Sequence, residues 1–180
     1  EPFLELSDDP EEGARMFGVP EATLRLGVRG KGKLVRYFED WCAVIDSLEV
    51  CKNLAENMEL LPLKRAAELM KTVTGLAFTE GQMFRVGERI INLERVYLVR
   101  EGITSKDDYL PSRFLKEPLP NGASKGSVFE MKSMLEEYYR ERGWNNNGIP
   151  VPENLRKMRL GYAVKDLKMH RRCTDKAVVR

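Results

Sequence analysis

Two side chains near the end of a predicted helix have types and spacing that could support redox chemistry. Asp46 and Cys51 stand five residues apart in the segment DSLEVC, residues 46–51. A thiolate can ligate iron, and a carboxylate can accept two hydrogen bonds from neighbouring N–H groups of a ring. On spacing alone, simpler interpretations are open: Asp46 as a solvated helix residue and Cys51 as a buried structural thiol.

The other cysteines do not extend this pair into a complete metal site. Cys42 lies on the apolar stripe of the same predicted helix and is interpreted as a core residue, while Cys173 lies in a basic segment. The sequence has no CxxC, CxxH or HxxxH spacing. Any other ligands would therefore come from outside this chain. Three widely spaced cysteines also favour a reducing, cytoplasmic setting over a disulfide framework.

The helix that would position Asp46 and Cys51 is predicted from its apolar spacing. Apolar residues recur at intervals of 4, 3, 4 and 3, which matches the helical period, at Leu34, Phe38, Trp41, Ile45 and Leu48. The segment 46–51 then falls where this helix gives way to a loop.

The rest of the chain predicts further helices separated by Gly and Pro. Helices are expected over 62–74, from a capping box at Thr79 to about Arg100, from a second capping box at Ser127 to Arg142, and after Pro152. Their predicted inward stripes are Leu63, Ala66, Ala67, Met70 and Val73 in the first, and Met83, Val86, Ile90, Leu93 and Tyr97 in the second. The fold class is therefore predicted as all-α, an irregular helical bundle.

Composition limits the possible functions. The 180 residues carry 30 basic and 28 acidic side chains, a net charge of +2, so no nucleic-acid or membrane partner is expected. No apolar run approaches the roughly 20 residues of a membrane-spanning helix. The domain is expected to cover residues 1–162, followed by a basic tail, 163–180, with six Lys or Arg against two Asp. The absence of an initial Met suggests part of a longer polypeptide.

The segment 46–51 stands in a longer collinear set of motifs. They are GKGK at 30–33, GERIINLER at 87–95, KDDYLPSRF at 106–114, and YYRERGW at 138–144 followed by GIP at 148–150. In this order and spacing, residues 15–162 resemble the C-terminal domain of the tungsten-containing aldehyde:ferredoxin oxidoreductases.

The resemblance implies specific roles through the family pattern Asp-x-x-Gly-Leu-Cys. It implies that Asp46 and Val50 bind a pterin and that Cys51 is one metal ligand, to a 4Fe-4S cluster; Glu49 stands where the family usually has Gly. The full-length enzyme would hold a tungsten bis-pterin and the cluster, and would oxidise aldehydes to carboxylates with ferredoxin as electron acceptor. No catalytic residue is expected in this chain, which would be inactive without the upstream domains; a homodimer is possible.

Two alternatives remain beside this interpretation. The chain could belong to the tungsten subunit of a benzoyl-CoA-type reductase, or it could be a degenerate, non-catalytic helical interaction domain, which Glu49 favours. A nucleic-acid-binding role for the basic tail ranks last, because the tail lacks interleaved aromatic residues. The tail could instead dock an acidic partner such as ferredoxin.

The downstream motifs are interpreted as structural. On the long helix, the charged residues Arg89, Glu94 and Arg95 are expected to pair with other helices. Asp107 and Asp108 are expected at the first turn of a short helix, and the indole of Trp144 is expected to fill the core.

Overall fold

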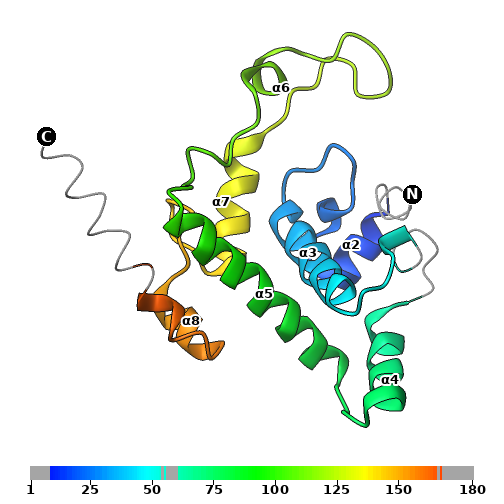
Figure 1. Ribbon diagram of the computed structural model, residues 1–180. Coiled ribbons are helices and arrows are strands. Elements are labelled where there is room, and N and C mark those ends of the chain that lie inside the picture. The colour runs from blue at the N-terminus through cyan, green and yellow to red at the C-terminus, as the bar shows by residue number, and fades with distance from the viewer. Residues whose placement is uncertain (1–8, 54, 56–60, 166, 168–180) are drawn as a thin grey trace, which may run out of the picture.

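The computed structural model describes residues 9–53, 55, 61–165 and 167, and this part of the chain contains helices and no β-strand. The predicted all-α fold is confirmed (Figure 1). None of the described helices is both long and apolar enough to cross a membrane. The elements are α2 (Pro10–Phe17), a 3-10 turn (Pro20–Ala22), α3 (Lys31–Ser47), α4 (Leu63–Thr74), α5 (Glu80–Arg100), α6 (Ser112–Lys116), α7 (Met131–Arg142) and α8 (Pro152–Lys157).

Helix α3 is the central element and packs against both α5 and α7. Two glycines allow these close approaches. A Cβ at Gly87 of α5 would overlap the backbone carbonyl of Asp40, and one at Gly32 of α3 would lie 2.5 Å from the backbone nitrogen of Tyr138 in α7. Because a Cβ does not fit at either position, the spacing of the three helices depends on glycine.

The ends of most predicted helices are confirmed. Thr79 and Gln82 form the expected capping box at the start of α5, and Gly75 ends α4 in the left-handed conformation with φ 75°. The second predicted capping box is wrong, since α7 begins only at Met131 and no side chain caps its first turn. Residues 127–130 instead belong to the connection before α7.

One helix, α2, was not predicted, although its sequence carries ordinary end signals. Asp9 accepts hydrogen bonds from the backbone N–H groups of Glu11 and Glu12 at 2.9 and 3.2 Å. Pro10 occupies the first turn, and Gly18 ends the helix with φ 67°. Asp-Pro at the start and Gly at the end are the usual helix boundaries, so the signal was present.

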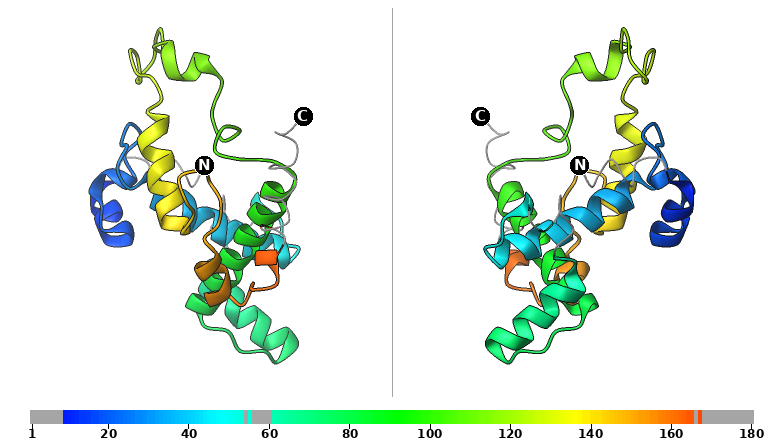
Figure 2. Two further views of the ribbon diagram at one scale, coloured as in Figure 1. Left: turned by 90° about the vertical axis from the view of Figure 1, so that its left-hand side faces the viewer. Right: turned by 90° about the vertical axis from the view of Figure 1, so that its right-hand side faces the viewer.

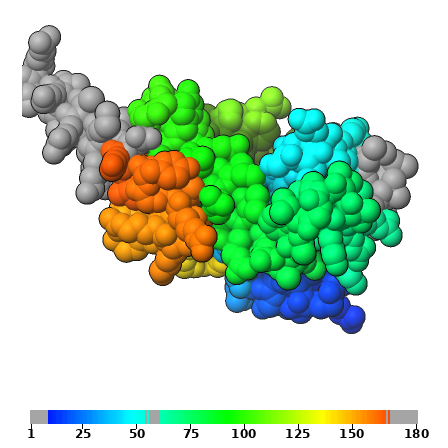
Figure 3. Space-filling model, turned by 60° about the horizontal axis from the view of Figure 1, so that its bottom comes forward, coloured from blue at the N-terminus to red at the C-terminus, as the bar shows by residue number. Residues whose placement is uncertain are grey.

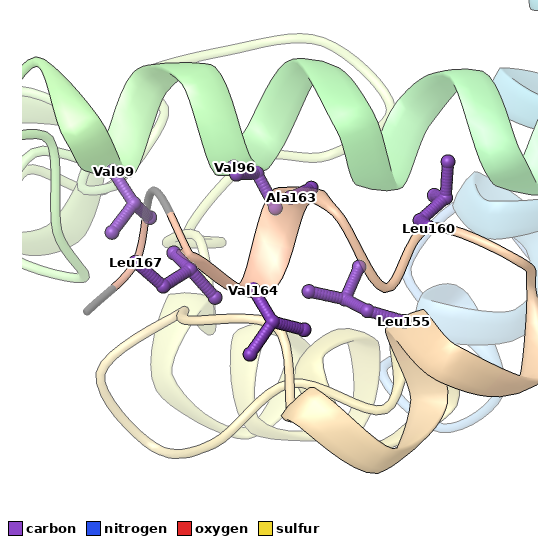
Figure 4. Close-up of a cluster of buried hydrophobic side chains, with 7 residues drawn as sticks. All are labelled: Val96, Val99, Leu155, Leu160, Ala163, Val164 and Leu167. Carbon is purple, nitrogen blue, oxygen red and sulfur yellow. The ribbon is translucent and has the colours of Figure 1, made fainter. Parts of the chain in front are cut away.

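Two clusters of apolar side chains stabilise the bundle. The first cluster joins α3, α4 and α5 through buried Val44, Leu63, Ala66, Ala67 and Met83. The second joins α5 to the chain after α8, and Figure 4 shows its side chains facing the Val96 and Val99 side of α5. Ala163, Val164 and Leu167 belong to this second cluster, so packing continues beyond the domain boundary expected at residue 162.

The buried face of α5 differs from the predicted stripe in its second half. Met83 is buried as expected, but Leu93 and Tyr97 are 38% and 55% exposed, and Val96 and Val99 are buried instead. Helix α5 contacts the first cluster with its N-terminal half and the second with its C-terminal half, so the inward face changes along the helix. In α4, Val73 is likewise exposed against prediction.

Residues 103–130 form an arm that projects from the helical body in all the ribbon views (Figures 1 and 2). The arm carries α6 and is held by backbone hydrogen bonds of its own, from Phe129 to Phe114 at 3.0 Å and from Gly126 to Leu119 at 2.9 Å. The side chains of Phe114, Leu119 and Phe129 are exposed.

Candidate functional site

The predicted site lies at the C-terminal end of α3, in a tight turn that closes the helix. The backbone N–H of Glu49 bonds to the carbonyl of Asp46 at 3.1 Å, and that of Val50 bonds to the carbonyl of Ile45 at 3.3 Å. This pair of bonds is a Schellman motif, whose key residue adopts the left-handed conformation that favours glycine. Glu49 occupies that position with φ 56°.

Asp46 and Cys51 both face solvent at this turn. The Asp46 carboxylate is 56% exposed and forms an ion pair with the Lys52 ammonium at 2.9 Å. Cys51 is a free and exposed cysteine, so its interpretation as a buried structural thiol is wrong. Val50, which lies between these two residues in the sequence, is partly buried. An exposed carboxylate and an exposed thiol at one helix end can both reach a group held outside the described chain.

Apolar packing fixes the position of this helix end. Leu48 and Trp41 pack against the first cluster, whose buried members come from α3, α4 and α5. Cys42, which was expected in the core, is only partly buried on α3. The turn that carries Asp46 and Cys51 is therefore attached to a rigid part of the bundle.

The described residues contain no group of three or more His, Cys, Asp or Glu side chains that could hold a metal ion. A 4Fe-4S cluster is usually held by four cysteine thiolates. The described residues offer one exposed thiol, Cys51, which could supply one of these four ligands if the other three come from elsewhere. Cys173 lies outside the described residues.

A buried charge network fixes α3 against α7. The guanidinium of Arg142 is fully buried and pairs with the Glu39 carboxylate at 2.6 Å and with the Asp40 carboxylate. Burial raises the pKa of Asp40, although Arg142 and Arg36 oppose this shift. Glu137 of α7 in turn accepts the backbone N–H of Gly30 at 2.9 Å, at the start of α3. The motifs at 30–33 and 138–144 lie close together here, and these contacts hold α3 against α7.

A second charge network fixes α5 to the base of the arm. Arg95 is 7% exposed and forms a two-point ion pair with Asp108, which also accepts the Tyr139 hydroxyl. Burial alone would raise the pKa of Asp108, but the hydrogen bonds from Arg95 and Tyr139 outweigh it and lower the pKa. Arg95 forms an ion pair as predicted, but its partner Asp108 lies in the connection before α6 and not on another helix.

In these motifs, the predicted position of the two aspartates is wrong, whereas the predicted burial of the tryptophan is confirmed. Asp107 and Asp108 do not lie in the first turn of a helix, since α6 begins at Ser112. Asp107 instead accepts the backbone N–H of Thr104 at 2.8 Å, within a turn. The indole of Trp144 fills the core as predicted, at 8% exposure, and donates to Asn92 at 2.8 Å.

The fold and this helix end define an all-α domain with one exposed thiol and one exposed carboxylate at the end of α3. The sequence model of the family described as "Aldehyde ferredoxin oxidoreductase, domains 2 & 3" matches residues 4–160. The chain belongs to this family of oxidoreductases.

Individual relatives support the assignment. The tungsten-containing aldehyde ferredoxin oxidoreductases of Pyrococcus horikoshii and Pyrococcus furiosus are 36% and 35% identical over 131 and 129 residues, covering 72% and 71% of this chain. A Pyrococcus furiosus protein named "Aliphatic sulfonate oxidoreductase, WOR-like subunit" is 32% identical over 158 residues, 82% of this chain. The chain spans about a fifth of the length of these relatives, 21% to 23%.

One solved structure shares the fold. The BamBC active-site complex of benzoyl coenzyme A reductase superposes with a TM-score of 0.61 over 77% of this chain and 20% of its own. The sequence identity of 22% makes this a likeness of fold alone.

Proposed function

We propose that this chain contributes one wall of the redox centre in a tungsten-dependent aldehyde:ferredoxin oxidoreductase, whose remaining ligands come from upstream domains. One observation carries the proposal: the turn that ends α3 exposes both the Asp46 carboxylate and the Cys51 thiol. When bound, the tungsten bis-pterin would supply the oxidation of an aldehyde to a carboxylate, and the 4Fe-4S cluster would pass the electrons to ferredoxin.

In this role, Asp46 binds and orients the pterin. Its two carboxylate oxygens accept neighbouring N–H groups of the ring, a strong arrangement because the acceptor is ionised. To bind the pterin, the Asp46 carboxylate must either give up its ion pair with Lys52 or accept hydrogen bonds from both groups. Since both side chains are about half exposed, with 56% and 50% accessible, this ion pair contributes only ~0–1 kcal/mol and is readily exchanged.

Cys51 closes the cluster and Val50 contacts the pterin from the intervening backbone. As a thiolate, Cys51 supplies one of the sulfur ligands to iron. Its exposure in this chain means that another domain must cover it in the assembled enzyme, because solvent exclusion tunes cluster potentials. The chain itself contributes position and no acid, base or nucleophile to the reaction.

Metal analysis of the full-length protein tests this assignment. We expect iron and tungsten in the wild type, loss of iron or a shift from a 4Fe-4S to a 3Fe-4S EPR signal in Cys51→Ala, and loss of tungsten in Asp46→Asn. Cys42→Ala is the matched control, because Cys42 is a partly buried cysteine within α3, whereas Cys51 is exposed in the turn after it. Unchanged iron content and EPR signal in Cys51→Ala would refute the ligand role. Absence of both metals from the wild type would support the degenerate interaction domain.

The substrate requires a separate assay. We expect reduction of ferredoxin, or of a viologen dye in its place, when an aldehyde is supplied. Turnover of an aliphatic sulfonate or of an aromatic CoA thioester, with no turnover of aldehydes, would instead assign the chain to a different member of the superfamily.

A further inference from the structure

We propose that a basic groove lined by residues of α5, α7 and α8 is a docking surface for an acidic protein. In the proposed function this protein is the electron acceptor, ferredoxin. The groove lies between the N-terminal half of α5, the end of α7 and the end of α8, and has a volume of about 800 Å³. Figure 3 shows the face of the molecule on which α5 lies between α8 and α4. Its cationic lining residues are Arg85, Arg89, Arg140, Arg142, Lys157 and Arg159.

The side chains of five of these residues are exposed and have no hydrogen-bond or ion-pair partner among the described residues: Arg85, Arg89, Arg140, Lys157 and Arg159. This distinguishes them from Arg142, which also lines the groove, and from Arg36 beside it. Arg142 is neutralised by Asp40 and Glu39, and Arg36 by Glu88 at 2.9 Å. The carboxylates that line the groove are Glu88, already paired, and Glu141. In a chain with a net charge of only +2, the groove therefore concentrates unpaired positive charge.

The backbone holds one of these cations in an unfavourable conformation. Arg159 has φ 61° in the turn that ends α8, where its N–H bonds to the Arg156 carbonyl at 2.9 Å and the N–H of Leu160 bonds to Leu155 at 2.7 Å. This is the same Schellman arrangement as at the end of α3, and it favours glycine. A residue with a strained backbone at an exposed rim is a reason to look for a binding role.

The groove is better suited to an acidic protein than to a nucleic acid. Its cations are spread over three segments and alternate with the apolar side chains of Phe78, Val86 and Met158 and with two carboxylates. Mixed apolar and cationic surface is typical of protein interfaces, where charge steers the encounter and apolar contacts hold the complex. Carboxylates in the groove would repel a continuous phosphate backbone.

The groove also lies close to the candidate site through the packing of the bundle. Phe78 and Val86, which line the groove, pack against the same apolar cluster as Leu48, the residue that precedes the turn with Cys51. A carrier in the groove would therefore be separated from the end of α3 by one packed cluster of side chains. The carrier's identity rests on the proposed function, while the existence of an acid-binding surface does not.

Binding measurements on the full-length protein that contains this chain test the groove directly. The probe is an acidic 4Fe-4S ferredoxin, with biolayer interferometry at low and physiological salt. We expect the double variant Arg89→Glu/Arg140→Glu to weaken binding by about tenfold or more at low salt, chiefly through the association rate. The control Lys125→Glu/Lys132→Glu makes the same charge change at exposed positions outside the groove and should change binding less than about twofold. Circular dichroism verifies that each variant folds, and Arg85→Glu/Lys157→Glu is the second groove variant.

Each outcome decides for or against the groove. Weaker ferredoxin binding by both groove variants, with little change in the control variant, supports it. Equal loss in groove and control variants would mean that only net charge matters, and would overturn it, as would absence of binding by the wild type. Tighter, groove-dependent binding of a DNA duplex would overturn it in favour of a nucleic-acid surface. Iron and tungsten content in Cys51→Ala tests the proposed function separately, so the two can fail independently.

Discussion

Replacing Glu49 by glycine should stabilise the protein, because Glu49 adopts a conformation that suits glycine. Its φ of 56° lies in the left-handed region, whereas the same position after α2, α4 and α7 is held by Gly18, Gly75 and Gly143. A side chain in this region costs about 1–2 kcal/mol. Glycine loses about 0.5–1 kcal/mol of this gain through its greater freedom in the unfolded chain.

The expected net gain for Glu49→Gly is about 0–1.5 kcal/mol, and its midpoint of about 0.7 kcal/mol raises Tm by roughly 1–3 °C in a domain of this size. Thermal unfolding followed by circular dichroism measures the shift. Glu49→Ala is the matched control, since it removes the same carboxylate but keeps the Cβ that causes the strain. We expect the glycine variant to exceed the alanine variant. Equal Tm values, or a lower value for glycine, would refute the assigned backbone strain.

Two further predictions concern packing and pH. Gly87→Ala should destabilise the protein by about 1–3 kcal/mol in urea unfolding, because its Cβ would overlap the Asp40 backbone where α3 meets α5. Gly81→Ala, on the same helix with open space around it, should be neutral or stabilising by up to about 1 kcal/mol; equal effects of the two substitutions would contradict this packing. Hydrogen bonds lower the pKa of Asp108 below 3.8, so its contribution is complete above about pH 4 and is lost as the pH falls through the folded-state pKa. Asp108→Asn should therefore be less stable than wild type at pH 7 and should lose less stability on acidification; parallel pH profiles would exclude this role for the ion pair with Arg95.

The sequence predicted most of the helices because their signals are local. Apolar spacing marked α3, and the Thr79 capping box and Gly75 marked the ends of neighbouring helices, since caps involve residues only a few positions apart. The same reasoning could have found α2 from Asp9, Pro10 and Gly18. Local patterns failed where tertiary contacts decided the outcome, as in α5, where Leu93 and Tyr97 are exposed because two different clusters contact the two halves of the helix.

The sequence by itself determined the candidate site as a pair of residue types, Asp46 and Cys51, and the collinear motifs determined the family. Only the tertiary structure decided that both side chains are exposed, because burial depends on which helices cover the end of α3. It also decided that Arg95 and Arg142 are partners of Asp108, Glu39 and Asp40 and hold helices in register. Likewise, the basic groove is assembled from residues more than fifty positions apart, which no local pattern in the chain could bring together.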